Sequence, residues 1–446
     1  MIYLIAPQKG TKRPDNISAP VGLCYIQAYL LSKKIDSKII DLEITSKDDL
    51  IKSFKKDKPK IVGISCFTDN RQYAFETAKL LKQLNPNIKI IFGAHHASAM
   101  YKQILENIPE VDIIVIGEGE ITFYELIEAL KANKDLKNVD GIVFREDNEI
   151  VVTKSRKPIM NLDSLPFPSY KDLDVKMYSW NFNGVNVTNY DIVTSRGCPY
   201  ACTYCSSSSF WGHMWRFRSS KNVVDEIELI NKKHGIKHFR IVDDNFTAGK
   251  DRAIEICKEI VSRNLKIDFW IQGRVQSLAN EDEYAQVLKK AGCYLIAFGI
   301  ESGSQKILDN INKKQTVQQI IDACNICKKA GIKINAYFMV GNDGETCKTI
   351  NETRKIIKII KPDEIGVSIT QIYPGTNMYE ETKKLNFCDD DHWLKNERPP
   401  LNTTEHSKVK LRLWQLTLLM TKYLNDKNLY TAFKLLIKTY LGSDFR

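Results

Sequence analysis

Three cysteines in one short loop, Cys198, Cys202 and Cys205, are the residues whose spacing most clearly indicates chemistry. Their thiolates can hold three corners of a four-iron cube, and no fourth cysteine nearby completes the set. The fourth iron would then be open to bind a small molecule directly. A structural zinc site, the alternative, would need four closed ligands. Gly197 and Pro199 place the cysteines in a loop rather than in a packed core element.

Two other stretches could also be linked to this chemistry. Cys324 and Cys327 have ligand-like spacing, but they lie within an apolar helical pattern, so we interpret them as packed thiols and expect a single cluster. The segment 210–218 is rich in aromatic and basic residues and could line a substrate cavity. We interpret it instead as packing beneath the cysteine loop.

The part of the chain before this loop alternates strands with helices, which predicts a doubly wound parallel sheet of the Rossmann-like type. The expected strands span residues 2–6, 38–42, 61–67, 89–92 and 112–116. The expected helices span residues 20–32, 48–55 and 71–83, and a further one starts near 122. Ligands bind at the carboxyl ends of such strands, where the loops 7–19, 65–70, 93–98 and 117–120 lie.

The alternation resumes around and after the cysteine loop. Six parallel strands are expected at residues 190–194, 238–242, 266–272, 294–300, 333–340 and 364–370. Helices are expected between them at residues 222–233, 251–263, 282–291, 317–330 and 351–360. Six strands are fewer than the eight of a closed barrel, so we predict a partial (β/α)6 barrel. Polar residues at the ends of these strands, such as Asp243 and Glu301, indicate an active site, with helix capping as the alternative.

The regions between and beyond these patterns set the expected domain boundaries. A small hairpin around residues 141–153 and a proline-rich stretch at 162–170 indicate a linker. A mostly helical region follows the barrel, with amphipathic helices expected at 409–424 and 430–440. The expected units are residues 1–137, the linker 138–174, the partial barrel 175–376 and the C-terminal region 377–446.

The C-x3-C-x2-C motif, with Tyr204 just before its last cysteine, resembles that of the radical S-adenosylmethionine (SAM) enzymes. In that family the three cysteines hold a [4Fe–4S] cluster, SAM chelates the open iron, and SAM breaks to a 5′-deoxyadenosyl radical. The resemblance implies that Tyr204 lies near the adenine. It also implies SAM contacts from residues at strand ends, namely Asp243, Asp244, Gln272, Arg274, Glu301, Ser302 and Gly341.

The loops of the first sheet resemble the cobalamin-binding domain that precedes many radical SAM domains. The matching pieces are Gly63-Ile-Ser65, Gly93-Ala-His-His-Ala-Ser98 and Gly117-Glu-Gly-Glu120. The resemblance implies cobalamin contacts from Ser65, Phe67, Thr68, Gly93, His95, His96, Gly117, Glu118 and Gly119. The alternative is a generic Rossmann-like sheet, although no G-x-G-x-x-G follows the first strand to indicate a dinucleotide site.

The chain departs from the methionine-synthase type of cobalamin domain. That type uses an Asp-x-His-x-x-Gly loop whose histidine ligates cobalt, whereas no histidine occurs here before His95. We therefore expect no bond between cobalt and a histidine. The lower face of cobalt would meet the loop Cys66-Phe-Thr68, water or nothing.

Composition indicates which partners and which cellular compartment to expect. Its 446 residues carry a net charge of +11, but the lysines, including Lys313-Lys314, look like scattered surface residues rather than a basic block, so nucleic acid is not an expected partner. Eleven cysteines, three of them at metal spacing, suit a reducing cytoplasm better than a disulfide framework. No apolar run approaches the roughly 20 residues that a membrane span needs.

Together the two resemblances imply a cytoplasmic, cobalamin-dependent radical SAM enzyme that methylates an unactivated carbon of a small molecule, lipid or peptide. Such an enzyme needs an external electron donor such as flavodoxin or ferredoxin. The first alternative is a cyclase or rearrangement enzyme that uses both cofactors without methyl transfer. An RNA methylthiotransferase would carry three further N-terminal cysteines, but only Cys24 and Cys66 precede the motif. A cobalamin-binding sensor would leave the cysteine motif unexplained.

Overall fold

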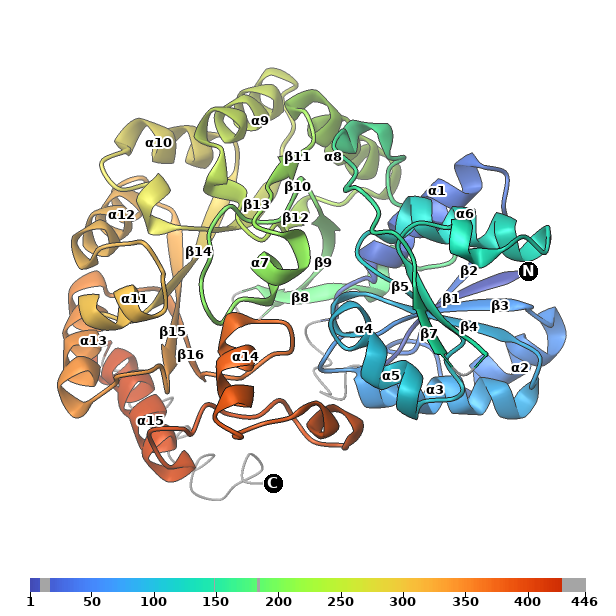
Figure 1. Ribbon diagram of the computed structural model, residues 1–446. Helices are drawn as coiled ribbons and strands as arrows, with labels where there is room; N and C mark the ends of the chain where they lie inside the picture. Colours follow the sequence, from blue (N-terminus) through green and yellow to red (C-terminus); the bar gives the residue numbers. More distant parts are fainter. Residues whose placement is uncertain (9–16, 148, 183–184, 427–446) are drawn as a thin grey trace.

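The computed structural model describes residues 1–8, 17–147, 149–182 and 185–426. Two seven-stranded sheets, each accompanied by helices, make up most of the chain (Figure 1). We call them the N-terminal sheet and the C-terminal sheet. The predicted α/β class is confirmed, whereas the helix expected at 430–440 lies outside the described residues.

The N-terminal sheet contains five parallel strands and an antiparallel hairpin at one edge. In spatial order its strands are β2 (Lys38–Asp41), β1 (Ile2–Ala6), β3 (Ile61–Ser65), β4 (Lys89–Gly93), β5 (Ile113–Val115), β6 (Ile142–Glu146) and β7 (Glu149–Val152). The hairpin of β6 and β7 forms where we expected one, and the structure adds it to this sheet.

Helices cover both faces of the N-terminal sheet (Figure 1). Alternate residues of β1 show this, because Tyr3 and Ile5 belong to one buried cluster while Ile2 and Leu4 belong to another. The first cluster includes residues of α2 (Lys47–Asp57), α3 (Arg71–Leu84), the short α4 (His95–Ala99) and α5 (Tyr101–Asn107). The second includes residues of α1 (Val21–Ser32) and α6 (Gly119–Lys131).

The C-terminal sheet contains six parallel strands, as predicted, and one antiparallel edge strand. Its spatial order is β16 (Glu364–Ile369), β15 (Lys333–Val340), β14 (Cys293–Glu301), β13 (Asp268–Gly273), β12 (His238–Ile241), β9 (Val185–Ile192) and β8 (Ser179–Phe182). Because β16 and β8 do not pair with each other, the curled sheet is an open partial barrel.

Helices surround the outer side of this curl (Figure 1). They are α8 (Ser220–His234), α9 (Lys250–Ser262), α10 (Asp282–Lys290), α11 (Gln305–Asn310), α12 (Val317–Lys329) and α13 (Cys347–Ile360). Two helices follow the last strand, α14 (Asn377–Lys384) and α15 (Lys408–Asn425). The expected apolar face of α15 is confirmed, because Leu411, Trp414 and Leu418 are buried in the core of the C-terminal sheet.

A third, two-stranded ladder frames the cysteines. β10 (Ser195–Arg196) pairs antiparallel with β11 (Arg216–Phe217), and the segment between them carries the cysteine loop and the short α7 (Ser206–Trp211). In the described parts of the chain, every helix is too short or too polar to span a lipid bilayer.

Candidate functional site

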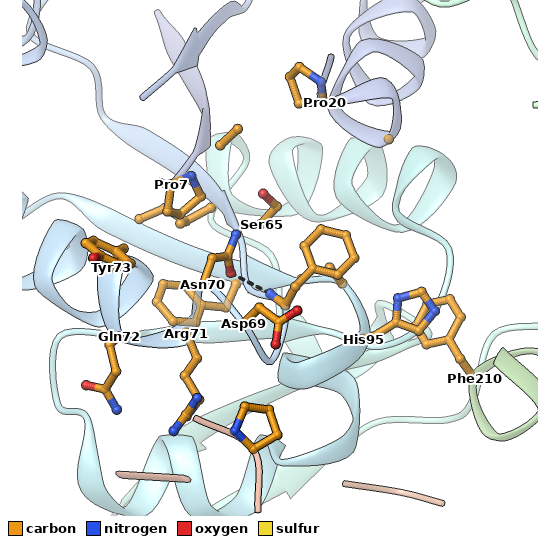
Figure 2. Close-up of a pocket in the computed structure, with 18 of the residues that line it drawn as sticks. Pro7, Pro20, Ser65, Asp69, Asn70, Arg71, Gln72, Tyr73, His95 and Phe210 are labelled. Carbon is orange, nitrogen blue, oxygen red and sulfur yellow. Dashed lines mark hydrogen bonds between the residues drawn. The ribbon is translucent and has the colours of Figure 1, made fainter. Parts of the chain in front are cut away.

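A cavity of about 2090 Å³ lies between the carboxyl edge of the N-terminal sheet and the cysteine segment (Figure 2). Pockets for drug-sized ligands measure roughly 300–1,000 Å³, so this cavity has room for a much larger ligand or for two ligands. The predicted site residues that line it are Ser65, Phe67, Gly93, His95, Gly117, Glu118, Gly119 and Asp244. Ser195 and Arg196, which lead into the cysteines, line it as well.

The cysteine loop is held in shape by backbone geometry. Gly197 has a φ of +84°, and a Cβ there would lie 2.0 Å from the carbonyl oxygen of Met214. Only glycine avoids that clash, so the residue before Cys198 allows the chain to turn tightly above β11. The positive-φ glycine confirms that the cysteines lie in a loop.

Hydrogen-bond donors surround the cysteine sulfurs. Arg274 Nη1 donates to Cys202 Sγ at 3.5 Å, and Asn245 Nδ2 lies 3.9 Å from Cys198 Sγ. Burial raises the pKa of the Cys198 and Cys205 thiols, so these donors help to stabilise the thiolates that an iron–sulfur cluster requires. All three cysteines are free of disulfide bonds.

The donor set fits a cube better than a single ion. Among the described residues, no three histidine, cysteine, aspartate or glutamate side chains are grouped so that they could hold one metal ion. Structural zinc requires such convergence, whereas a four-iron cube takes each thiolate at a different corner. Cys324 and Cys327 are both buried in α12, as expected for packed thiols.

The two aspartates after β12 support the strand that leads into the cysteines. The carboxylate of Asp243 accepts hydrogen bonds from Thr194 N at 2.6 Å, Thr194 Oγ1 at 2.5 Å and Ser195 Oγ at 2.6 Å. Asp244 accepts from Gly197 N at 3.1 Å, and burial raises its pKa. Asp243 is thus occupied by protein donors, while Asp244 also faces the cavity; a SAM contact for either stays a prediction.

Glu301 forms a buried triad that includes a lysine the sequence analysis missed. Its carboxylate accepts from Lys313 Nζ at 2.8 Å and from the Tyr204 hydroxyl at 2.9 Å, and Lys313 also lies 3.1 Å from that hydroxyl. Lys313 is only 6% exposed, so its interpretation as a scattered surface residue is wrong. The physical reason is the Glu301 carboxylate, which compensates its buried charge. The triad holds Tyr204, the residue expected near the adenine.

The remaining strand-end residues separate into two groups. Arg274 is buried, and its guanidinium lies 3.8 Å from the ring centroid of Tyr200 in the cysteine loop. Gln272, two residues earlier on β13, is exposed. Ser302 turns away toward α13, where its hydroxyl lies 3.2 Å from a threonine hydroxyl, and Gly341 N donates to a glutamate in its own loop. Only Arg274 of this group joins the cysteines directly.

The two neighbouring histidines have different surroundings. His95 lines the cavity, and its ring lies 5.7 Å from that of Phe67 and 3.9 Å from that of Phe210 (Figure 2). Burial lowers the pKa of His95 to about 4, so this imidazole is neutral at pH 7. His96 is fully buried outside the cavity lining, with Nδ1 3.2 Å from Thr68 Oγ1. The structure thus places His95 beside the cavity and pairs His96 with Thr68.

The segment from 386 to 401 walls another side of the cavity and was not singled out from the sequence. Its anchor is Trp393, which is fully buried and donates from Nε1 to the Tyr379 hydroxyl at 2.8 Å. Arg71, the first residue of α3, donates to the carbonyls of Trp393 and Lys395, both at 2.9 Å. A tryptophan in a charged stretch was the one available signal, because Arg71, which joins this segment to the N-terminal sheet's helix α3, lies 322 residues before Trp393.

Comparisons with known proteins agree with this arrangement. Residues 192–357 match the radical SAM superfamily, and residues 12–127 match the B12 binding domain. An uncharacterized methyltransferase of Pyrococcus horikoshii is 35% identical over 84% of this chain and 81% of its own length. The anaerobic magnesium-protoporphyrin IX monomethyl ester cyclase of Rubrivivax gelatinosus is 31% identical over 81% of this chain and 66% of its own length.

A solved structure shares the fold. The radical SAM methyltransferase TsrM of Kitasatospora setae, with tryptophan and a SAM analogue bound, superposes with a TM-score of 0.72. The superposition covers 86% of this chain and 76% of the other, at 20% sequence identity.

Proposed function

The chain belongs to the radical SAM enzymes that carry a B12-binding domain, and from this membership we propose that it methylates an unactivated carbon of a small molecule, lipid or peptide. Its cofactors are one [4Fe–4S] cluster, SAM and cobalamin. When bound, the cluster and SAM supply a radical that abstracts hydrogen, and cobalamin supplies a methyl group.

The observation that carries the proposal is a cavity that residues of both halves of the chain border. Ser65, His95 and Gly117 border it from the N-terminal sheet, while Arg196 and Asp244 border it from the cysteine side. The three cysteines do not line the cavity themselves, but Arg196 leads directly into their loop, so a substrate bound there would lie between the two expected cofactor sites. Holding reactants together in this way removes much of the entropic barrier to reaction.

The residues around the cavity have separate tasks in this proposal. Cys198, Cys202 and Cys205 would hold the cluster, and Arg274 would stabilise a thiolate by hydrogen bonding. Tyr204, fixed by its triad, would position the adenine of SAM. The corrin would be bordered by Ser65, Phe67, His95 and the glycines at 93, 117 and 119. The side chain of Phe67 is 44% exposed and so is available for contact with a ligand.

Ring closure or rearrangement is the second candidate, and the cyclase relative supports it. The methyltransferase relative supports methyl transfer more strongly, because the match extends over 81% of that protein against 66% of the cyclase. The extra length of the cyclase has no counterpart in this match.

Several finer assignments belong to the same proposal. Cobalamin would bind within residues 1–137, the partial barrel would span 175–376, and the region from 377 onward would shape the substrate site. A reduced protein such as flavodoxin or ferredoxin would deliver electrons. We propose the cytoplasm as its location, since the eleven cysteines are all free thiols in the structure.

The test supplies methyl-deuterated SAM, reductant and an extract of the host to the reconstituted protein. Methyl transfer predicts a product that carries the deuterated methyl group, detected by mass spectrometry. Formation of 5′-deoxyadenosine together with an unlabelled, altered product would favour ring closure instead.

The matched control is the triple variant with Cys198, Cys202 and Cys205 replaced by alanine. It should lose both iron and 5′-deoxyadenosine formation, because no ligands remain for the cluster. The pair Cys324→Ala/Cys327→Ala should keep about four irons per chain. SAM cleavage that persists in the triple variant would contradict the assignment of the cluster site.

A further inference from the structure

Both ends of the cysteine-bearing segment meet at one pair of arginines. Arg196 in β10 lies directly opposite Arg216 in β11, and the residues 197–215 between them include all three cysteines. Like charges directly opposite each other across a ladder repel, so this closure needs a compensating group. One anion placed between Arg196 and Arg216 can therefore hold both ends of the cysteine-bearing segment.

Glu118 of the N-terminal sheet's loop supplies that anion. Its Oε1 accepts from Arg196 Nη1 at 2.5 Å, and its Oε2 accepts from Arg216 Nη1 at 2.8 Å and from Ile159 N at 2.8 Å. Glu120 accepts from the other terminal nitrogen of Arg196 at 2.5 Å. The four charged side chains are between 2% and 9% exposed, and their charges balance.

The loop that carries Glu118 also borders the cavity. It connects β5 with α6, and its Gly117 and Gly119 line the same cavity. One carboxylate thus connects the edge expected to meet cobalamin with the base of the segment that carries the cluster ligands. The resemblance to cobalamin-binding domains implies that Glu118 contacts the cofactor, but its carboxylate oxygens are occupied by protein donors.

We infer that Glu118 is a positioning residue that fixes the cluster-bearing segment 197–215 against the N-terminal sheet. The part of the chain that is expected to bind cobalamin thereby helps to position the segment that holds the iron–sulfur cluster. This inference goes beyond the proposed reaction, because it holds equally for methyl transfer and for ring closure. It rests on the cluster being bound by the cysteine motif, which the iron content of the unaltered protein checks separately.

The second end of the segment depends more on Glu118 than the first end does. Asp243 and Asp244 hold Thr194, Ser195 and Gly197, which all lie at the first end. At the second end, Arg216 also donates to the Ile159 carbonyl at 2.6 Å, its guanidinium lies 5.4 Å from the centroid of the Trp211 ring, and β11 pairs with β10. Loss of Glu118 would therefore leave the first end anchored by Asp243, Asp244 and Glu120, while the second end would lose its carboxylate partner and keep only these contacts.

The experiment compares Glu118→Gln with the unaltered full-length protein, both reconstituted anaerobically. Glutamine keeps the size of the side chain but removes its charge and replaces one acceptor oxygen with a donor. Two quantities are measured: the rate at which a chelator removes iron, and the electron paramagnetic resonance of the reduced cluster with and without SAM. We expect iron release to rise at least tenfold and the change in signal on adding SAM to broaden or vanish.

The matched control is Glu125→Gln, on the helix α6 that follows the Glu118 loop. Glu125 also pairs with an arginine, but this partner is Arg156, which lies outside the cysteine segment. The side chain of Glu125 is 43% exposed. It should leave both quantities unchanged.

A second variant guards against misfolding of Glu118→Gln. Arg216→Met removes the single nitrogen that donates both to Glu118 and to the Ile159 carbonyl, so it should also speed iron release. Faster release with an altered SAM response in either variant supports the inference. Iron release and spectra that match the unaltered protein in whichever variants fold would overturn it, as would an equal change in Glu125→Gln.

Discussion

Replacing Lys313 by methionine would leave the buried Glu301 carboxylate with one of its two partners. Methionine matches the length of the lysine stem, so the substitution removes the charge and the hydrogen bonds with little change in volume. The remaining partner is the Tyr204 hydroxyl at 2.9 Å. The variant therefore measures what the ion pair contributes to the site.

The size of the effect follows from the geometry. At 2.8 Å and an effective dielectric constant of about 20, two unit charges attract by roughly 6 kcal/mol, part of which offsets their desolvation. Breaking a buried pair from one side costs about 3–5 kcal/mol. The Tyr204 hydroxyl still donates to Glu301 in this variant, which limits the loss. We therefore expect a loss near 3 kcal/mol, the lower end of the range.

The assay is anaerobic thermal unfolding of the reconstituted protein. A loss of about 3 kcal/mol should lower the melting temperature of the C-terminal sheet's unit by roughly 6–12 °C. Lys329→Met is the control, because its 2.9 Å pair with Asp282 is exposed and should contribute at most about 1 kcal/mol. The double variant Lys313→Met/Glu301→Gln should recover at least half of the loss.

A melting temperature for Lys313→Met that falls no further than that of Lys329→Met would refute this reasoning. It would mean that the buried pair contributes no more to stability than a solvent-exposed one. Equal losses in the single and double variants would instead show that the two charges are not coupled.

Three further outcomes are expected. Trp393→Ala should destabilise the chain by about 3–5 kcal/mol, because it empties a fully buried site. Trp393→Phe should cost less, and anaerobic melting curves compare the two. Burial raises the pKa of Glu345 to about 7 from its ordinary 4.5, so between these pH values the folded chain holds a proton that the unfolded chain has released. The free energy of unfolding is therefore highest below about pH 4.5 and falls by roughly 3 kcal/mol as the pH rises through 7. Glu345→Gln should flatten this dependence in melting temperatures from pH 5 to 8, and an unchanged slope would contradict the assignment. The cobalt(II) protein loaded with cobalamin should show no splitting from an axial nitrogen in electron paramagnetic resonance, since His95 is held between Phe67 and Phe210; a triplet that disappears in His95→Ala would show the opposite.

Local patterns were enough to predict the architecture. Alternating strands and helices require a parallel sheet, because each crossover needs a helix, and both sheets follow from that rule. The six parallel strands of the second sheet and the buried face of α15 agree with their apolar periodicity. The hairpin at β6 and β7 was also predictable, but its pairing with β5 depended on which edge of the sheet was left open.

The cysteine loop is the part of the site that the sequence determined by itself. Its ligands lie within eight residues of each other, so spacing alone limits which metal group they can hold. Gly197 is likewise a requirement of this segment, because a Cβ there would lie 2.0 Å from the Met214 carbonyl oxygen.

The partners of the charged residues were decided only by the tertiary structure. Glu118 meets Arg216 across 98 residues, and Arg71 meets Trp393 across 322. A lone glutamate or lysine in a sequence has the same appearance whether it faces solvent, a cofactor or another side chain. Lys313 shows the consequence, since it resembles a surface lysine until the fold buries it against Glu301. Burial makes such charges costly unless a partner is present, and which partner is present depends on how distant segments pack together.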